Sequence, residues 1–216
     1  MPRLLLFARR PRLGKVKTRL CPPLEPDQAL TLYRGFLTDQ LALLRRCAED
    51  YRVEVWWDGP PGETTAGLDL DGIEQRVQCD GDLGRRLEHA WGTADGPTCA
   101  IGVDSPTIGR DAIDRAFARL SELRPMVLSP AADGGYVLIA LWRPRPELFR
   151  DIPWGGPGVT EATLACAERI GLRVELLPPG YDVDDEAGLR RLEADLSRPA
   201  IAARAPATVR ALRLLS

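Results

Sequence analysis

Short apolar segments alternate along the chain with longer segments in which apolar residues recur at helical spacing. The apolar segments predict strands at about residues 3–8, 53–57, 75–79, 98–103, 126–129, 136–142 and 173–177. The helical pattern predicts helices from near Asp27, over about residues 83–91, 110–123 and 160–170, and from near Asp185. Residues 198–216 predict a last amphipathic helix, with Val209, Leu212 and Leu215 as its apolar side. This alternation is typical of an α/β fold whose mostly parallel sheet is covered on both faces.

The length and composition limit the classes of protein to which the chain can belong. A chain of 216 residues fits a single domain, here residues 1–216, and can bury a proper core. Its net charge of −2 gives no general attraction to nucleic acid or to a membrane surface. No apolar run reaches the roughly 18 residues that a membrane span needs. Five scattered cysteines, without a C-x-x-C pair, argue against a zinc site and favour a reduced cytoplasm.

Ligands of open parallel sheets bind outside the carboxyl ends of the strands, so the residues that follow each predicted strand are candidates for a site. The first strand is followed by a strongly basic segment. The later strands are followed by acidic or glycine-rich segments. Cations and carboxylates on one rim suit a substrate that carries phosphate groups, with a divalent metal ion between the two charges.

The basic segment is RRPRLGKVKTRL, residues 9–20, and it contains the only two lysines of the chain, Lys15 and Lys17. Gly14 lets the backbone turn tightly or approach a ligand closely. Together with Arg9 and Arg19, the lysines can neutralise a diphosphate or triphosphate. The segment fits neither the G-x-x-x-x-G-K-[ST] nor the G-x-G-x-x-G pattern. The alternative is a solvated basic turn without a ligand.

Carboxylates follow two of the later strands. Asp104 ends the apolar run Ala100–Val103, where a carboxylate can hold Mg²⁺ or Mn²⁺. Alternatively it forms an Asx-turn or caps the next helix. In Asp182-Val183-Asp184-Asp185, an extended backbone would put Asp182 and Asp184 on one side, where they need a cation. The alternative is a cap and an acidic first turn for the following helix.

Two glycine-containing segments complete the predicted rim. In Asp133-Gly134-Gly135, the glycines leave room for a sugar ring, and Asp133 can bind hydroxyl groups or act as a base. The same residues are also typical of an ordinary hairpin turn. The segment Gly81-Asp82-Leu83-Gly84 could line a ligand, or it could simply begin a helix that Asp82 caps.

Six motifs in order resemble one bacterial family of glycosyltransferase-A-like proteins, often labelled as arsenosugar-biosynthesis glycosyltransferases. They are Phe7-Ala8-Arg9 with Gly14–Leu20, Gly81-Asp82-Leu83-Gly84-x-Arg86-Leu87, Ile101–Pro106, Pro130-Ala131-x-Asp133-Gly134-Gly135-Tyr136, Ile152–Gly155 and Asp182-Val183-Asp184. The chain is more distantly similar to 2-phospho-lactate guanylyltransferase and molybdenum-cofactor guanylyltransferase. The resemblance covers nearly the whole chain to about residue 195. It implies a three-layer α/β/α nucleotide-diphospho-sugar transferase (GT-A-like) fold with a mostly parallel mixed sheet.

The resemblance also implies roles for individual residues. Asp104 would be the principal metal ligand, and Asp184 would be the second, with Asp182 as the other choice. The phosphates would meet the basic segment, and the base or ribose would lie beside residues 82–84. The implied nucleotide-binding residues are Arg9, Gly14, Lys15, Lys17, Arg19, Asp82, Leu83 and Gly84. Asp133 would orient or deprotonate the acceptor, beside Gly134 and Gly135.

We therefore expect a transferase that uses an activated nucleotide and a divalent metal, Mg²⁺ or Mn²⁺. In one hypothesis it transfers a sugar from a nucleotide sugar to a small-molecule acceptor. In a second hypothesis, a substrate phosphate attacks a nucleoside triphosphate and pyrophosphate leaves. Pro106 stands where many glycosyltransferases of this fold have the second aspartate of D-x-D, which favours the nucleotidyltransferase branch. A third hypothesis is a nucleotide-binding module without catalysis.

Overall fold

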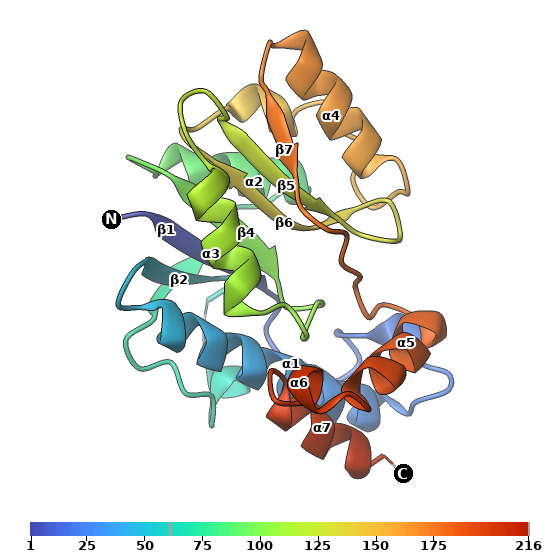
Figure 1. Cartoon of the computed structure of the whole chain (residues 1–216). Coiled ribbons are helices and arrows are strands. Elements are labelled where there is room, and N and C mark those ends of the chain that lie inside the picture. Colours follow the sequence, from blue (N-terminus) through green and yellow to red (C-terminus); the bar gives the residue numbers. More distant parts are fainter. Residues whose placement is uncertain (61, 216) are drawn as a thin grey trace.

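A seven-stranded sheet forms the centre of the protein (Figure 1). The computed structural model describes residues 1–60 and 62–215. The strand order is β3-β2-β1-β4-β6-β5-β7, in which β6 runs antiparallel to β4 and β5 and the other pairs are parallel. The predicted mostly parallel mixed sheet is thus confirmed. The strands are β1 (Arg3–Ala8), β2 (Arg52–Trp57), β3 (Glu74–Val77), β4 (Thr98–Gly102), β5 (Met126–Pro130), β6 (Tyr136–Leu141) and β7 (Val174–Leu176).

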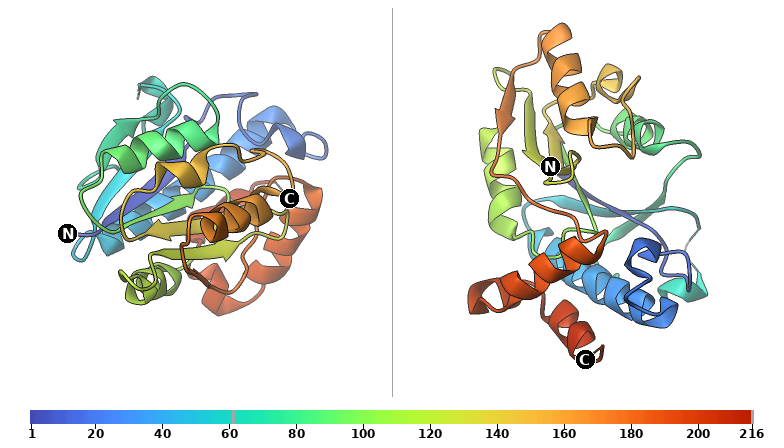
Figure 2. Two further views of the ribbon diagram at one scale, coloured as in Figure 1. Left: turned by 90° about the horizontal axis from the view of Figure 1, so that it is seen from above. Right: turned by 90° about the vertical axis from the view of Figure 1, so that its right-hand side faces the viewer.

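Helices cover both faces of the sheet. One apolar core contains side chains of α1 (Pro26–Cys47), α3 (Arg110–Arg119), α5 (Glu186–Leu196) and α7 (Pro206–Arg213). The other contains side chains of α2 (Leu83–Gly92), α4 (Val159–Arg169) and the short helix η3 (Pro146–Phe149). Along β1, Leu4 and Leu6 enter the first core and Leu5 enters the second, as strand geometry requires. Figure 2, in its right-hand view, shows α3 and α4 on opposite sides of the sheet.

One helix begins close to its predicted start, and another ends earlier than predicted. The first helix begins at Pro26, next to Asp27, because Glu25 forms a capping box with Gln28 and the proline occupies the first turn. The predicted helix over residues 110–123 ends at Arg119, where Leu120 becomes extended. Short helices also form at η1 (Thr18–Leu20), η2 (Glu63–Thr65) and α6 (Pro199–Ala202).

The prediction of one amphipathic helix over residues 198–216 is wrong: the described part of this segment forms two helices, α6 and α7. Pro206 begins the second helix, because its ring and missing N–H do not fit the interior of a continuous one. The fully buried side chains of α7 are Ala207, Thr208 and Ala211, while two of the three predicted residues, Leu212 and Leu215, are partly buried against the same core. These small residues approach Gly35 of α1 closely. Ser216 lies outside the described residues.

The buried carboxylate of Asp39 in α1 fixes the beginning of α7. It accepts hydrogen bonds from the backbone N–H groups of Ala207 (2.9 Å) and Thr208 (2.8 Å) and from the Thr208 hydroxyl (2.7 Å). It thereby satisfies N–H groups that have no partner within the helix. Among the described residues, no helix has the length and apolar character to cross a membrane.

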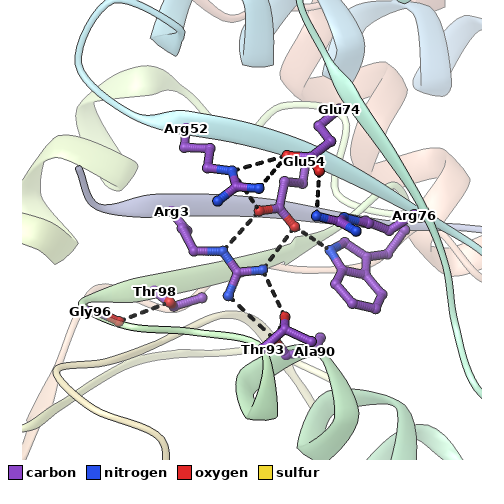
Figure 3. Close-up of polar contacts among 10 residues, drawn as sticks. Arg3, Arg52, Glu54, Glu74, Arg76, Ala90, Thr93, Gly96 and Thr98 are labelled. Atoms are coloured by element: carbon purple, nitrogen blue, oxygen red, sulfur yellow. Dashed lines mark hydrogen bonds and ion pairs between the residues drawn. The ribbon is translucent and has the colours of Figure 1, made fainter.

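A buried ion pair joins β1, β2 and the end of α2 (Figure 3). Arg3 donates from Nε and Nη2 to the two carboxylate oxygens of Glu54, at 2.8 Å each. Trp56 Nε1 donates to the same carboxylate, and Arg3 also reaches the Ala90 carbonyl and the Thr93 hydroxyl. Burial acts to raise the pKa of Glu54, but the hydrogen bonds and charge of Arg3 and the Trp56 donor lower it below its ordinary value overall.

Candidate functional site

The basic segment after β1 is held in place by groups that sequence reasoning did not assign to it. The Asp58 carboxylate, which follows β2, accepts from the backbone N–H of Arg10 at 2.8 Å and pairs with Arg12 at 3.2 Å. The Tyr33 hydroxyl of α1 accepts from the Arg9 N–H and donates to the Arg9 carbonyl, at 2.9 and 2.8 Å. Two basic residues of the segment, Arg10 and Arg12, therefore share one carboxylate of the protein itself.

Other cations of this segment face the solvent. The backbone turns at Gly14, which has a φ of +66°, and the Lys15 N–H donates to the Arg12 carbonyl at 3.0 Å. Lys15 is exposed, and so are Arg9 and Arg19. These three are residues predicted to meet phosphate, and their side chains lie where a ligand in solvent can reach them.

The fourth predicted phosphate residue, Lys17, is placed differently. Its side chain is only 4% exposed, and its ammonium group pairs with Asp104 at 2.5 Å and Asp184 at 2.8 Å. The two carboxylates come from segments 80 residues apart in the chain, yet they meet at one cation. Burial acts to lower the pKa of Lys17, but the two carboxylates outweigh it and raise the pKa, so the amine stays charged.

Several contacts bring the two acidic segments together. The Val183 N–H donates to the Asp104 carbonyl at 2.9 Å, and the Ser105 hydroxyl donates to the Asp182 carboxylate. Gln40, a buried residue of α1, donates to the Ser105 carbonyl at 2.9 Å. The cap of α3 is Gly109, so Asp104 does not serve as its cap. Its carboxylate, 43% exposed, points to Lys17 instead.

The three aspartates of residues 182–185 have three different surroundings. Asp184 faces Lys17 and is 44% exposed, whereas Asp185 caps α5 by accepting from the Gly188 N–H. Burial raises the pKa of Asp182 to about 7, and the charges of Asp104 and Asp184 add to this, against the hydrogen bond from Ser105. The predicted helix cap is thus confirmed for Asp185, while its two acidic neighbours lie beside Asp104.

The chemistry of these donors decides whether a divalent metal fits the site. Asp104 and Asp184 present hard oxygen ligands to the same point, which in this structure is taken by an ammonium group. Within residues 1–60 and 62–215, no group of three or more His, Cys, Asp or Glu side chains could hold a metal. Mg²⁺ often uses only one or two carboxylates, together with water and substrate phosphates. The pair therefore fits a metal whose remaining ligands come from a substrate.

The turn between β5 and β6 contains the predicted acceptor residues. It is a hairpin turn, in which the exposed Asp133 carboxylate accepts from the Gly135 N–H at 3.0 Å. Gly134 has a φ of +92°, and an added Cβ would meet the Pro157 carbonyl oxygen at 1.7 Å. The Gly134 carbonyl in turn accepts from the Thr160 N–H. Close packing onto the start of α4 is therefore one reason for glycine here. The negative charge of Asp133 is one of the causes that raise the pKa of Asp182.

The predicted base or ribose residues lie at the beginning of α2. Asp82 caps this helix by accepting from the Arg85 N–H at 2.9 Å, as the alternative interpretation proposed. Leu83 is 43% exposed. At Gly84, an added Cβ would meet the Phe149 carbonyl and Trp154 Nε1, both at 2.3 Å. The structure thus gives Asp82 and Gly84 local roles and leaves Leu83 at the surface.

Sequence reasoning missed the residues that support the site from behind. Gln40 is almost fully buried on α1, and its only signal was a polar residue on an apolar helix face. Tyr33 lies among the apolar residues of the same helix, yet its hydroxyl holds the Arg9 backbone. Asp58 directly follows β2, at the end of the strand where ligand-binding residues are expected. Its contact with Arg10 joins residues 48 positions apart, and the local sequence pattern does not predict it.

Comparison with known proteins identifies a family whose model matches the chain. The model of the family described as "Uncharacterized protein conserved in bacteria (DUF2064)" matches residues 43–156. Among curated proteins, none matches the chain.

Solved structures share the whole fold. A protein from Desulfovibrio desulfuricans G20, provisionally described as a nucleotide-diphospho-sugar transferase, is 27% identical, with a TM-score of 0.81 over 99% of this chain and 97% of that one. A nucleotidyl transferase from Methanothermobacter thermautotroptrophicus is 14% identical, with a TM-score of 0.62 over 90% and 96%. CMP:2-keto-3-deoxy-manno-octonic acid synthetase, complexed with CTP, is also 14% identical, with a TM-score of 0.54 over 91% and 98%. The chain has the fold of these transferases.

Proposed function

The chain belongs to the DUF2064 family of uncharacterized bacterial proteins, and from its site we propose that it is a metal-dependent transferase acting on an activated nucleotide. The donor we favour is a nucleotide sugar, from which a glycosyl group passes to a small-molecule acceptor. One observation carries the proposal: Asp104 and Asp184, from distant parts of the chain, converge on one cation of the basic segment, Lys17.

The charges around the site support a diphosphate ligand. Arg9, Lys15 and Arg19 are exposed on the loop that also contains Lys17. Their charges would bind the phosphates and stabilise the negative charge that develops on a leaving nucleoside diphosphate. The likeness to the Desulfovibrio protein, over nearly the whole of both chains, supports a nucleotide sugar as the donor.

A divalent metal would be held by Asp104 and Asp184, where it would supply positive charge to phosphate oxygens. The chain itself supplies the remaining functions. Lys17 and the exposed cations would orient the diphosphate, and the Ser105–Asp182 contact would keep the carboxylates in position. Asp133 is exposed and close enough for its charge to act on Asp182, which supports a role in orienting or deprotonating the acceptor.

The second candidate is nucleotidyl transfer, in which a substrate phosphate attacks the α-phosphorus of a nucleoside triphosphate. The P–O bond to the β-phosphate breaks, and pyrophosphate leaves. One observation favours this candidate. Pro106 removes the D-x-D pattern after Asp104. In this reaction, Lys15, Lys17 and Arg19 would stabilise the charge on pyrophosphate.

A panel of substrates separates the two reactions. Purified protein is incubated with Mn²⁺ and with nucleoside diphosphate sugars or nucleoside triphosphates, and stabilisation is measured by thermal shift. Each nucleotide is then incubated with the protein and with mixtures of sugars or phosphorylated acceptors. The released nucleoside diphosphate or pyrophosphate is measured. We expect stabilisation by nucleotide sugars and release of nucleoside diphosphate. Release of pyrophosphate would support the second candidate, and binding without any product would support the non-catalytic module.

Matched variants connect that activity to the proposed site. Asp184→Asn removes one of the two converging charges, and we expect it to abolish metal-dependent turnover. The control is Asp71→Asn, a similar change at an exposed aspartate in the loop before β3. If Asp184→Asn kept the turnover of Asp71→Asn, the assignment of this carboxylate to the metal would be wrong.

A further inference from the structure

Lys17 occupies the point at which the two proposed metal ligands meet. Its side chain is 4% exposed, while those of Asp104 and Asp184 are 43% and 44% exposed. The ammonium thus lies on the inner side of the cluster, and the carboxylates form its outer, solvent-facing side. The Phe36 ring lies 5.6 Å from the ammonium and contributes a further favourable contact for a cation.

The loop backbone holds Lys17 in this place. Lys17 has a φ of +51° and a ψ of +34°, which is an uncommon conformation for a residue with a side chain. Val16 before it and Leu20 after it are buried in the core. Lys15, in contrast, is exposed although it is only two positions away. The backbone therefore directs one lysine of the loop inward and leaves the other in solvent.

We propose that Lys17 is the resident counter-ion of the carboxylate pair and makes the binding of a divalent metal depend on phosphate. The inference rests on the proposed function, because it takes Asp104 and Asp184 as the metal ligands. It adds the reason why Lys17 is buried among them, rather than exposed like the other cations expected to bind phosphate.

The dependence follows from the cost of burying an unpaired charge. A metal that binds both carboxylates competes directly with the ammonium, which would then remain in a buried position without its partners. A phosphate bound with the metal supplies new acceptor oxygens for the ammonium. Metal alone therefore binds weakly, and metal together with a diphosphate binds strongly. This is a thermodynamic coupling between two ligands through one side chain.

Titration calorimetry with Mn²⁺ and inorganic pyrophosphate tests this coupling. Lys17→Gln keeps a polar side chain without the charge, and Lys17→Arg keeps the charge. Without pyrophosphate, we expect Lys17→Gln to bind Mn²⁺ roughly 5- to 150-fold more tightly than the wild type, the usual range for coupled sites. Lys17→Arg should bind Mn²⁺ as weakly as the wild type. Pyrophosphate should tighten Mn²⁺ binding in the wild type but much less in Lys17→Gln, after correction for the complex formed in solution.

The outcomes separate this inference from the proposed function. If Lys17→Gln and the wild type bind Mn²⁺ alone equally, while Asp184→Asn loses all Mn²⁺ binding with pyrophosphate, only the role of Lys17 is overturned. If Asp184→Asn binds Mn²⁺ with pyrophosphate as the wild type does, the carboxylate pair is not the metal site. In that case the proposed function loses its central observation as well.

A second measurement uses the natural protein and does not depend on the folding of a variant. Because the chain has only two lysines, acetylation by an amine-reactive reagent can be followed at each by mass spectrometry. We expect Lys15 to react quickly and Lys17 to react at least tenfold more slowly. Mn²⁺ alone, at the concentration that saturates the natural protein when pyrophosphate is present, should leave the Lys17 rate unchanged. Equal rates at the two lysines, or a Lys17 rate that rises with Mn²⁺ alone, would overturn the proposal.

Discussion

Two clusters in the described part of the protein join a buried cation to carboxylates, and they differ in almost every other property. In the first, Arg3 and Glu54 are 3% and 0% exposed, and the partly exposed Arg52 also lies 3.4 Å from Glu54, so cations fully balance this carboxylate. In the second, Lys17 is equally buried, but two carboxylates meet it and both are more than 40% exposed. The first cluster lies within β1 and β2, whereas the second follows the carboxyl ends of β1 and β4 (Figures 1 and 3).

The difference shows how the same kind of charge pairing can be closed to solvent in one place and open to it in another. Each Glu54 oxygen accepts a hydrogen bond from Arg3, and one of them also accepts from Trp56, so neither oxygen lacks a partner. Asp104 and Asp184 together carry more negative charge than Lys17 neutralises, and their outer sides face solvent. A ligand in solvent can reach these two carboxylates, whereas it cannot reach a buried carboxylate whose charge is already balanced.

The largest effect on stability is expected from Glu54→Gln, which leaves the Arg3 charge buried without its partner. We expect unfolding free energy to fall by about 3–5 kcal/mol, the usual cost of breaking a buried pair. Urea unfolding measures this, with Glu74→Gln as the control, because Glu74 forms a partly exposed pair with Arg52. Equal stability of the two variants would show that the Arg3 cluster is not essential to the fold.

The opposite result is expected from Asp104→Asn. One carboxylate of the open cluster is lost, so turnover should fall roughly 10²- to 10³-fold, as for other removed electrostatic groups in active sites. Unfolding free energy should change by less than about 1 kcal/mol, because the residue is partly exposed and Asp184 still pairs with Lys17. Steady-state kinetics and urea unfolding on the same preparation check both. Unchanged turnover would contradict the function that we propose for this cluster.

Acid should weaken the closed cluster in a definite direction. Because the folded pKa of Glu54 lies below its ordinary value of 4.5, its contribution to stability is complete above pH 4.5. The contribution decreases as the pH falls from there through the lower folded pKa. Unfolding free energy measured at a series of pH values below 5 should therefore decline more steeply in the wild type than in Glu54→Gln. Parallel profiles would show that the pKa of Glu54 does not change on folding.

The smallest effect is expected from Lys15→Gln, at the exposed edge of the open cluster. Its loss should change the unfolding free energy by no more than about 0.5 kcal/mol. Nucleotide binding, measured by calorimetry, should weaken by a few fold and should depend less on salt, since an exposed charge acts through solvent. A large loss of stability would mean that Lys15 has a structural role in the loop.

Much of the fold could be predicted because its information is local. The alternation of apolar residues identified all seven strands of the described sheet, and the helices α2 and α5 begin at the predicted residues. The features that the pattern did not predict are less visible in the sequence. Glu25 and Gln28 form a capping box at the start of α1, and Pro206 divides the C-terminal helix.

For the site, the sequence by itself determined which residue types follow the strands, and therefore that cations and carboxylates gather at one rim. It could not decide how each cation of residues 9–20 is used, because that depends on partners up to 167 positions away. Only the tertiary structure directs Arg10 and Arg12 to Asp58, and Lys17 to Asp104 and Asp184. The physical reason is that residue spacing fixes the face and the end of an element, whereas charge pairing follows the packing of elements that are distant in the chain.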